Sequence, residues 1–317
     1  MDEFHLIERY FRKGTRPRAD VFLGIGDDAA VVSMPAGHRL VIASDSLIAG
    51  THFPDKTPAH ALGYRCLAVN LSDLAAMAAQ PLWATLALSM PASVADWLEA
   101  FTQGFFELAA EANVALVGGD TVRGPLSMTV TVHGSVEVDG HVARTGAAAG
   151  DRIYVTGTVG DARAGLDVLL HEQSAKGLND KLLQRFLYPS PRVMPGQQLA
   201  GIASAMIDIS DGLHDDLGKL LHVSGLGADL ELAALPISEE LLRFASTDAA
   251  IELALTGGDD YELCFTVPPN KESQFVQLAE HWDCAATCIG EVSSKKEARW
   301  WHDGQLHAIG KSAFRHF

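Results

Sequence analysis

The sequence predicts a two-domain protein of mixed α/β architecture. The chain has 317 residues, more than one compact core usually holds, and strand-like runs alternate with helix-like runs in both halves. A segment of small and turn-forming residues, Thr145–Asp151 (TGAAAGD), lies near the middle of the chain and is typical of a domain boundary. We therefore expect one domain over residues 1–147 and a second over residues 148–317.

Hydrophobic periodicity, with proline and glycine at the boundaries, predicts the elements of the first domain. The expected helices are Phe4–Phe11, Pro58–Ala79 and Val94–Asn113. The expected strands are Val21–Ile25, Ala29–Ser33, Leu40–Ser44, Trp83–Met90, Val114–Val117 and Ser127–Val138. Asp45 follows directly on one of these strands and Gly118-Gly119-Asp120 on another, so we expect these residues at strand ends.

The second domain is predicted in the same way. The expected strands are Arg152–Thr156, a strand ending at Asp208, and the pair Glu252–Leu255 and Tyr261–Val267 around a turn at Thr256–Asp260. The expected helices are Ala162–Glu172 and one that begins near Asp211. Tyr188–Gly196 contains three prolines and is predicted to be an extended loop, and Asp303-Gly304 predicts a hairpin turn.

Composition excludes several classes of function. The 40 acidic and 24 basic residues give a formal charge of -16 without a basic patch, which argues against nucleic acid and anionic lipid as partners. No run of apolar residues is long enough for a membrane span, and the N-terminus lacks the plan of a secretory signal. The four cysteines lack zinc-ligand spacing and are expected to be free thiols in the cytoplasm: Cys66, Cys264, Cys284 and Cys288.

Aspartates recur beside glycine or small residues at the ends of apolar runs. They are Asp27 and Asp28 in GIGDDAA, Asp45 in ASDS, Asp120 in VGGDT, Asp208 and Asp211 in IDISDG, and Asp259 and Asp260 in TGGDDYE. One such aspartate is usually a helix cap or a turn residue. Five clusters with the same pattern favour hard oxygen ligands for several Mg²⁺ ions, because gathered carboxylates repel one another unless cations neutralise them.

Asp73 lies in a helix that is apolar nearly all the way round, so we expect the helix to be buried. Asn70 shares its face, and the only nearby cation in the sequence, Arg65, lies on a different part of the helical wheel. Either a distant Arg or Lys or a metal ion balances the charge of Asp73. The other aspartates favour the metal.

Glycine supplies the complementary feature, since Gly118-Gly119 lets backbone N–H groups approach a phosphate closely. Ser210 and Asp211 are expected to cap a helix whose N-terminus faces an anion. Gly24–Ala29 formally fits a dinucleotide fingerprint, but its two aspartates would repel a pyrophosphate. A Walker A loop and a catalytic Ser or Cys context are absent from the sequence.

Seven segments, in this order, resemble the thiamine-monophosphate kinases, a family of the aminoimidazole-ribonucleotide-synthetase-like superfamily. They are GIGDDAAVV (24–32), SDSLIAGTHF (44–53), NLSDLAAMAA (70–79), VGGDT (117–121), DISDGLHDDLG (208–218), LTGGDDYELCF (255–265) and FRHF (314–317). The resemblance covers nearly the whole chain. It implies the two-domain α/β synthetase-like fold, a cytoplasmic homodimer that pairs N-terminal sheets, and ATP, Mg²⁺ and thiamine monophosphate as ligands.

The resemblance also implies roles for individual residues. Magnesium would be coordinated by Asp28, Ser44, Asp45, Ser46, Asp73, Asp120, Asp208 and Asp211. ATP would contact Gly119, Asp120, Arg144 and Ser210, and thiamine monophosphate would contact His52, Asp259 and Phe314. Asp45, Asp120 and Arg144 would serve catalysis most directly. Two positions depart from the family, which often has Glu where Asp259 stands and a larger aromatic residue at Phe314.

The predicted activity is therefore magnesium-dependent transfer of the γ-phosphoryl group of ATP to thiamine monophosphate, which makes thiamine diphosphate. Three alternatives remain at this point: a sister synthetase that activates an amide oxygen with ATP, a non-catalytic regulator that binds magnesium and nucleotide, and a metal-dependent phosphohydrolase.

Overall fold

A computed structural model describes residues 3–171 and 177–310 of the chain. It divides into two compact units. Unit 1 comprises Met1–Leu74 and Ala79–Asp139, and unit 2 comprises Ala75–Ala78 and Gly140–Phe317. Both units mix helices with sheets, so the predicted α/β class is confirmed. The domain limits predicted from the sequence stay a prediction.

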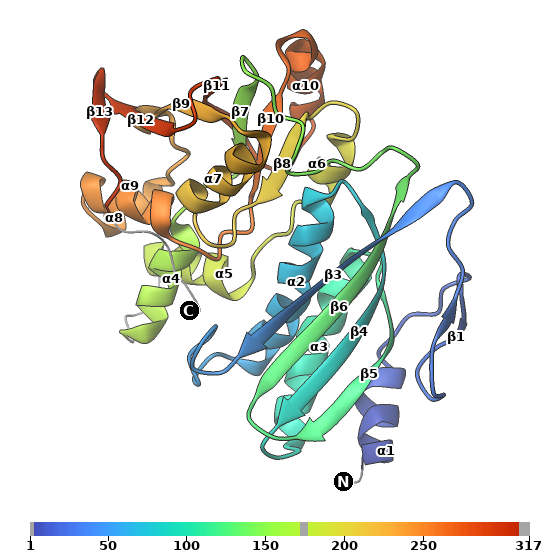
Figure 1. Cartoon of the computed structure of the whole chain (residues 1–317). Helices are drawn as coiled ribbons and strands as arrows, with labels where there is room; N and C mark the ends of the chain where they lie inside the picture. The colour runs from blue at the N-terminus through green and yellow to red at the C-terminus, as the bar shows by residue number, and fades with distance from the viewer. Residues whose placement is uncertain (1–2, 172–176, 311–317) are drawn as a thin grey trace. The chain divides into compact units, whose positions relative to one another are not determined.

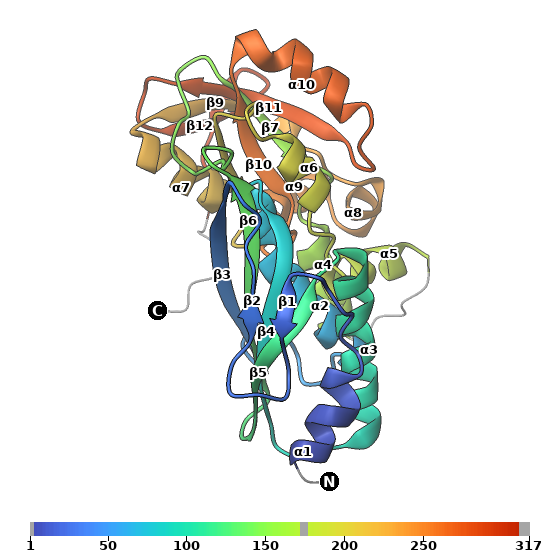
Figure 2. The ribbon, with the colours of Figure 1, turned by 90° about the vertical axis from the view of Figure 1, so that its right-hand side faces the viewer.

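Unit 1 is built on a four-stranded sheet in the order β3-β6-β4-β5 (Figure 1). Its strands are β3 (His38–Ile48), β4 (Gln80–Met90), β5 (Ala115–Arg123) and β6 (Ser127–Glu137). Helices α2 (Ala59–Ala76) and α3 (Ala95–Glu111) cover one face of this sheet (Figure 2). Inward side chains alternate along the strands, and Met128, Val130 and Val132 of β6 are fully buried.

The N-terminal segment of unit 1 begins with a helical stretch that changes pitch. Helix α1 (Glu3–Leu6) continues as a short π-helix, η1 (Ile7–Arg12). A two-stranded antiparallel pair follows, β1 (Val21–Leu23) with β2 (Val31–Val32). The loop between these strands carries the GIGDDA sequence, so the predicted aspartate cluster at residues 27 and 28 lies on a loop.

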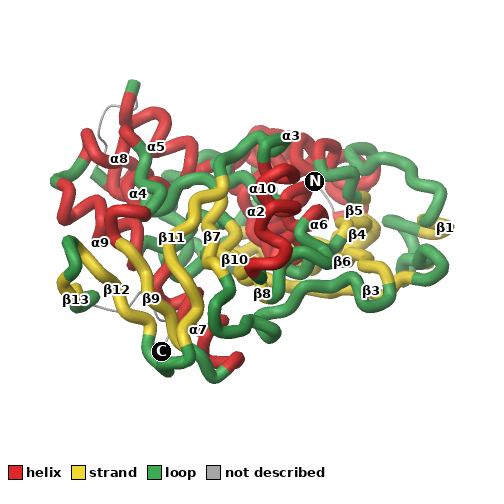
Figure 3. The backbone as a smooth tube through the Cα atoms, turned by 90° about the horizontal axis from the view of Figure 1, so that it is seen from above, coloured by secondary structure: helices red, strands yellow, loops and turns green. Residues whose placement is uncertain are grey.

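Unit 2 is built on a seven-stranded sheet, counted over the described residues, in the order β13-β12-β9-β11-β7-β10-β8 (Figure 3). The strands are β7 (Arg152–Thr156), β8 (Ala205–Asp208), β9 (Gly227–Glu231), β10 (Leu263–Val267), β11 (Ala286–Ser293), β12 (Ala298–His302) and β13 (Gln305–His307). All pairs are antiparallel except β12 with β9. The predicted hairpin turn at Asp303-Gly304 joins β12 to β13.

The helices of unit 2 pack on the sheet and on one another. They are α4 (Asp161–Leu170), α5 (Leu178–Leu187), α6 (Val193–Gln198), α7 (Leu213–Ser224), α8 (Glu239–Phe244), α9 (Thr247–Thr256) and α10 (Glu272–Ala279), with short 3₁₀ turns η2 (Leu232–Ala234) and η3 (Pro269–Lys271). Successive residues of β7 face opposite layers: Val155 packs in a cluster with Leu217 of α7, and Tyr154 in a cluster with Phe275 of α10.

One predicted strand is wrong. Glu252–Leu255 belongs to helix α9, which begins after Ser246. The Ser246 side chain accepts a hydrogen bond from the backbone N–H of Ala249, which caps the helix, and Ala249 and Ala250 are strong helix formers. The short apolar run is compatible with either structure, and the upstream cap decides in favour of the helix.

The proline-rich stretch Tyr188–Gly196 is only partly the extended loop that we predicted. Helix α6 begins at Val193 and contains Pro195 in its first turn. Proline is tolerated there because backbone N–H groups of the first turn have no partner within the helix.

Three strands of unit 1, β3, β4 and β5, are longer than predicted, and in β3 and β5 this changes the setting of an aspartate. β3 runs from His38 to Ile48, so Asp45 lies inside a strand. β5 runs from Ala115 to Arg123, so Gly118, Gly119 and Asp120 are strand residues and not a turn. The ladder between β4 and β5 shifts register between Leu116 and Gly118, which indicates a bulge at Val117, directly before the glycines.

Candidate functional site

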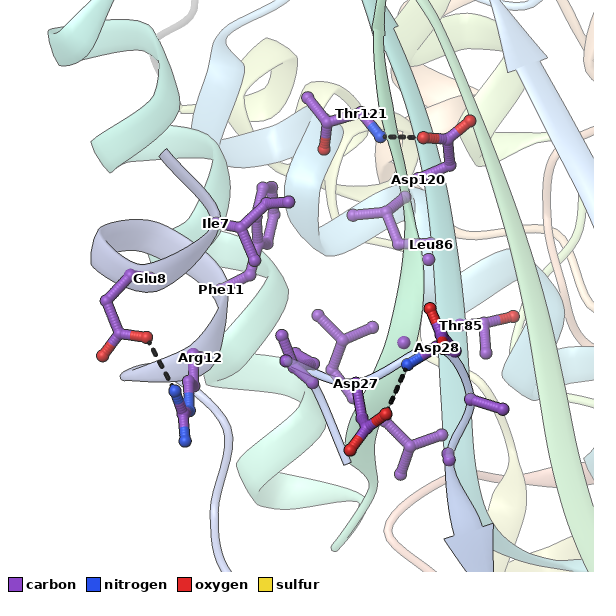
Figure 4. Close-up of a pocket in the computed structure, with 18 of the residues that line it drawn as sticks. Ile7, Glu8, Phe11, Arg12, Asp27, Asp28, Thr85, Leu86, Asp120 and Thr121 are labelled. Atoms are coloured by element: carbon purple, nitrogen blue, oxygen red, sulfur yellow. Dashed lines mark hydrogen bonds and ion pairs between the residues drawn. The ribbon is translucent and has the colours of Figure 1, made fainter. Parts of the chain in front are cut away.

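Unit 1 contains a cavity of about 900 Å³ between its N-terminal helix, the loop that follows β1, and strands β4 and β5 (Figure 4). Ile7 and Phe11 of η1 supply apolar lining. Arg12 also lines the cavity, and its Nη1 atom donates to Glu8 Oε2 at 3.1 Å. The volume lies in the range of cavities that hold small organic ligands.

The other side of the cavity is acidic and rich in glycine. Asp27 and Asp28 come from the loop, and Asp120 comes from β5 (Figure 4). Gly119, also of β5, lines the cavity next to Asp120. The Asp28 backbone N–H donates to Asp27 Oδ1, and the Thr121 N–H donates to Asp120 Oδ1, each at 2.8 Å. Within the described residues, the second oxygens of Asp27 and Asp120 have no hydrogen-bond partner and are available to a ligand.

Gly119 has to be glycine for two reasons. Its φ is 152°, a conformation that side chains rarely adopt. A Cβ atom at this position would lie 1.9 Å from the Leu86 carbonyl oxygen of β4, so the two backbones approach too closely for any side chain. Glycine at this position therefore allows β5 to pack closely against β4, and the close approach of a phosphate that the sequence predicted for this segment stays a prediction.

The residues of β3 divide between the two faces of the sheet. Ser44 and Ser46 share one face, where their hydroxyls bond to Thr131 Oγ1 and Thr129 Oγ1 at 2.9 and 2.7 Å. Asp45 points to the opposite face because side chains alternate along a strand. Its backbone N–H donates to Asn70 Oδ1 of α2 at 2.8 Å. Asp45 therefore does not form one cluster with Ser44 and Ser46.

Two further candidates in unit 1 lie outside the cavity. His52 is half-buried in the loop after β3, and its Nδ1 accepts from the Ile48 backbone N–H at 3.1 Å. The apolar sequence of α2 had led us to expect that Asp73 is fully buried, but Asp73 is only half-buried. The cost of desolvating its carboxylate is correspondingly smaller, so the argument for a metal at this residue is weaker than the sequence implied.

In unit 2, Asp208 is buried at the end of β8, and Ser210 and Asp211 form the loop before α7. Asp216 of α7 organises this loop, because its Oδ2 accepts from the Ser210 and Asp211 backbone N–H groups at 2.9 and 2.8 Å. Burial raises the pKa of Asp216, although Lys219, whose Nζ lies 2.7 Å from Asp216 Oδ1, opposes that rise. Lys219 also pairs with Asp211.

Sequence analysis missed Asp216 and Lys219. The signal was the Asp and Lys three positions apart in HDDLGK, which is also the usual pattern of a solvent-exposed helical pair.

In the TGGDDYE sequence, Thr256 ends α9 and residues 257–262 form the loop that leads to β10. Asp259 is half-buried with φ at 73°, and the Tyr261 hydroxyl donates to its Oδ1 at 3.3 Å. Asp260 is turned inward, and its carboxylate accepts from the Gly160 and Ala162 N–H groups at 2.7 and 3.2 Å, at the start of α4. Asp260 is therefore a helix cap, the common role for an isolated aspartate.

The remaining candidates are Arg144, which is exposed in the loop before β7, and Phe314, which lies outside the described residues. Of the predicted residues, the cavity brings together Asp28, Gly119 and Asp120. Unit 2 holds Arg144, Asp208, Ser210, Asp211 and Asp259, so the predicted set divides between the units. Among the described residues, no three His, Cys, Asp or Glu side chains converge as they would around a single metal ion.

None of the helices in the described part of the chain is long and apolar enough to cross a membrane.

The chain matches known protein families over most of its length. Residues 26–136 match the AIR synthase related protein, N-terminal domain, and residues 148–302 match the AIR synthase related protein, C-terminal domain. It is 45% identical over 319 residues to the thiamine-monophosphate kinase of Escherichia coli (strain K12), covering 99% of this chain and 98% of that protein. The thiamine-monophosphate kinase of Haemophilus influenzae is 42% identical over 322 residues, with coverage of 100% and 98%.

Solved structures agree. Thiamine-monophosphate kinase from Stenotrophomonas maltophilia K279a superposes with a TM-score of 0.88 at 43% identity, covering 97% of this chain and 98% of that one. AaThiL complexed with AMPPCP and TMP gives a TM-score of 0.79 at 31% identity, covering 99% and 97%. Hydrogenase maturation protein HypE in complex with ATP gives 0.78 at 18% identity over 98% and 95%, a likeness of fold alone. Its sequence and its fold together place this chain in the thiamine-monophosphate kinase family of the AIR synthase related proteins.

Proposed function

We propose that the chain is an ATP:thiamine-monophosphate phosphotransferase that makes thiamine diphosphate. The observation that carries the proposal is the cavity of unit 1, where Asp28, Gly119 and Asp120 meet beside an apolar wall. The family supports it, since AaThiL at 31% identity is complexed with AMPPCP and TMP.

The chemistry explains why an enzyme of this kind needs no catalytic histidine or cysteine. The acceptor is a phosphate monoester with a second pKa near 6, so it is mostly a dianion at pH 7 and is already a nucleophile. One of its oxygens forms a bond to the γ-phosphorus of ATP, the bond from that phosphorus to the β–γ bridging oxygen breaks, and ADP leaves. The difficulty is to bring two polyanions into line, so positioning and charge neutralisation supply the catalysis.

The donors present at the acidic end of the cavity fit Mg²⁺, because they are carboxylates with oxygens available to a ligand. Asp28 and Asp120 would hold one ion here. The further proposed ligands would hold other Mg²⁺ ions, and they are Asp45, Asp73, Asp208, Asp211 and the hydroxyls of Ser44 and Ser46. Bound Mg²⁺ neutralises phosphate charge. Gly119, which lines the cavity, is the proposed contact to a phosphate, and Arg144 and Ser210 are the further proposed contacts to the nucleotide.

The proposed contacts to thiamine monophosphate come from His52, Asp259 and Phe314. Asp259 is held in its loop with φ at 73°, where it offers a carboxylate to a cationic thiazolium ring. The shorter Asp at this position, where the family often has Glu, makes this contact the one most sensitive to the position of the loop.

We also propose a cytoplasmic homodimer that pairs two copies of unit 1. Strand β3 is an edge strand of eleven residues, and it exposes Leu40, Ile42 and Ile48. A long apolar edge is a template for pairing with another chain, so a second copy is its natural partner. The four free cysteines suit a reducing compartment.

The test is incubation of the purified chain with ATP, Mg²⁺ and thiamine monophosphate, followed by chromatography of the products. We expect thiamine diphosphate and ADP in equal amounts. Phosphate release without thiamine diphosphate would indicate a phosphohydrolase, and nucleotide binding without turnover would indicate a regulator. Consumption of formylglycinamidine ribonucleotide in place of thiamine monophosphate would indicate a sister synthetase.

The variant that tests the site is Asp120→Asn. We expect turnover at saturating Mg²⁺ to fall by roughly 100-fold or more, because positioned charge supplies most of the rate. Asp139→Asn is the matched control, since Asp139 is exposed at the far end of the unit 1 sheet and pairs only loosely with Arg39 at 3.4 Å. Near-normal turnover in Asp120→Asn would reject this ligand assignment.

A further inference from the structure

Glu262 is a fully buried carboxylate that none of the proposed ligand contacts uses. Its side chain is 0% exposed and receives four hydrogen bonds. Arg192 donates from Nε to Oε2 and from Nη2 to Oε1, Arg185 Nη2 donates to Oε1, each at 2.6 Å, and the Thr156 hydroxyl donates to Oε2 at 2.7 Å. The forked contact from Arg192 is the strong, orientation-specific form of the ion pair.

The donors come from three separate parts of unit 2. Arg185 lies on α5, Arg192 precedes α6, and Thr156 ends β7. Gly157 leaves space for the carboxylate, because a Cβ atom there would lie 2.2 Å from Glu262 Oε1. The geometry therefore fixes the side chain of Glu262 in one position.

The second buried carboxylate of the same loop is Asp260, 1% exposed. Burial raises the pKa of Asp260 well above its usual value, and the N–H groups of α4 and the charge of Arg185 oppose that rise. Arg185 and Arg192 therefore both pair with Glu262, and the charge of Arg185 also acts on Asp260. The buried side chains of Asp260 and Glu262, which flank Tyr261 in the sequence, anchor the loop of residues 257–262. Asp259 of the same loop stays partly exposed.

The anchored loop is joined by its backbone to the Ser210 loop. The Asp259 N–H donates to the Ser210 carbonyl at 2.9 Å, the Tyr261 N–H donates to the Ile209 carbonyl at 2.8 Å, and the Ile209 N–H donates to the Glu262 carbonyl at 2.8 Å. Asp259 is the proposed contact to thiamine monophosphate, and Ser210 is the proposed contact to the nucleotide. Any shift of Glu262 therefore moves the backbone of both.

We propose that Glu262, held by Arg185 and Arg192, is a positioning residue that sets the Asp259 loop and the Ser210 loop as one body. A buried ion pair of this kind is weak evidence of stabilisation, and it is best explained by the geometry that it specifies. The effect of Glu262 on catalysis rests on the proposed function. The coupling of the two loops is independent of that function.

The primary variant is Glu262→Gln, which keeps the shape of the side chain and removes its charge. We expect KM for thiamine monophosphate to rise roughly tenfold or more with a smaller change in kcat, because the Asp259 contact serves ground state and transition state alike. Arg192→Lys keeps the charge but loses the fork, and we expect an intermediate rise. If Glu262→Gln does not fold, Thr156→Val removes one donor to Glu262 and, with it, the acceptor of the neighbouring Leu263 N–H at 2.8 Å, and it should show the same change at smaller size.

The matched control is Asp151→Asn. Asp151 is also a buried carboxylate of unit 2, with hydrogen bonds from the Ser204 hydroxyl and the Ala148 N–H, but it precedes β7 at the end opposite Thr156. We expect Asp151→Asn to lower the melting temperature and leave KM unchanged. An equal rise of KM in the control would overturn the positioning role and leave only a general loss of stability.

Hydrogen exchange followed by mass spectrometry separates this proposal from the proposed function. In Glu262→Gln, without any ligand, we expect faster exchange in peptides covering residues 209–212 and 257–262 together, and no change there in Asp151→Asn. Faster exchange confined to residues 257–262, or no change in either peptide, overturns the proposal. If the wild-type chain makes no thiamine diphosphate but both peptides still respond, the function has failed and the coupling of the loops stands.

Discussion

Asp20 shows how one carboxylate fixes the entry to β1. Arg18 donates from Nε to Asp20 Oδ1 at 2.9 Å and from Nη2 to Oδ2 at 2.7 Å, and it also bonds to the Asn113 carbonyl. The Arg18 hydrogen bond lowers the pKa of Asp20 from its usual 3.8, with burial opposing it. The pair ties the turn before β1 to the end of α3.

The lowered pKa makes the contribution of Asp20 dependent on pH. Because the folded state prefers the charged carboxylate, the stabilisation is present above the unfolded pKa of 3.8 and is lost as pH falls through the lower folded value. We expect Asp20→Asn to lower the melting temperature at pH 7 and to match the wild-type chain near pH 2. The exposed Asp55→Asn is the control, with no effect at either pH. A deficit in Asp20→Asn that persists at the acid end would mean that packing, and not charge, is responsible.

Residues whose role is local could be predicted from the sequence, and residues whose role depends on distant partners could not. Asp28, Gly119 and Asp120 lie in short glycine-containing motifs and line one cavity, and their roles at a site stay predictions. Glu262 was overlooked because its partners are 70 and 77 positions away in the chain. One feature of the sequence could have indicated Glu262. A glutamate directly before the apolar strand LCFTV needs either solvent or hydrogen-bond partners for its carboxylate.

At the scale of elements, α2 and α3 cross with their backbones in contact. A Cβ atom at Gly63 of α2 would lie 1.8 Å from the Phe101 carbonyl oxygen, and one at Gly104 of α3 would lie 2.0 Å from the His60 carbonyl oxygen. Each helix therefore presents a glycine to the other. The close approach allows both helices to lie on the same face of the sheet.

We expect Gly63→Ala to lower the free energy of unfolding by about 1–3 kcal/mol, because neither backbone can move away without disturbing the sheet beneath. Gly218→Ala in α7 is the control, since a Cβ there meets nothing within 4 Å. That substitution should stabilise by up to about 1 kcal/mol through helix propensity. Chemical denaturation of both variants measures the difference, and a neutral Gly63→Ala would show that the helices can separate at little cost.

Long elements with a clear period were predictable, and short apolar runs were not. The periodicity of residues 58–79 and 94–113 predicted α2 and α3 close to their true limits. Residues 252–255 were assigned to a strand because four residues, three of them apolar, are too few to show a period of their own. The extent of β3 and β5 depends on pairing with β6 and β4, which is information held in other segments of the chain.

At the scale of the whole molecule, the proposed assembly makes a clear prediction. Ile42 is 57% exposed on the edge strand β3, while Leu306, 61% exposed on β13 of unit 2, serves as a control of similar chemistry. We expect light scattering after gel filtration to give a dimer for the wild-type chain and for Leu306→Lys, and a monomer for Ile42→Lys. A dimer that survives the charge at residue 42 would locate the interface elsewhere.

The last residues of α2 and those that follow it, Ala75–Ala78, belong to unit 2 although the rest of the helix belongs to unit 1. Ala75, Ala76 and Ala78 are buried among Leu199, Phe265 and their neighbours, and the Ala75 carbonyl sits where a Cβ on Gly196 would be. A gene cut between codons 139 and 140 would therefore yield a C-terminal fragment whose core lacks residues 75–78 and has a cavity in their place. Unit 2 therefore cannot be expressed alone as one continuous segment without losing part of its core. A fragment starting at Gly140 should aggregate unless a peptide carrying residues 75–78 is supplied.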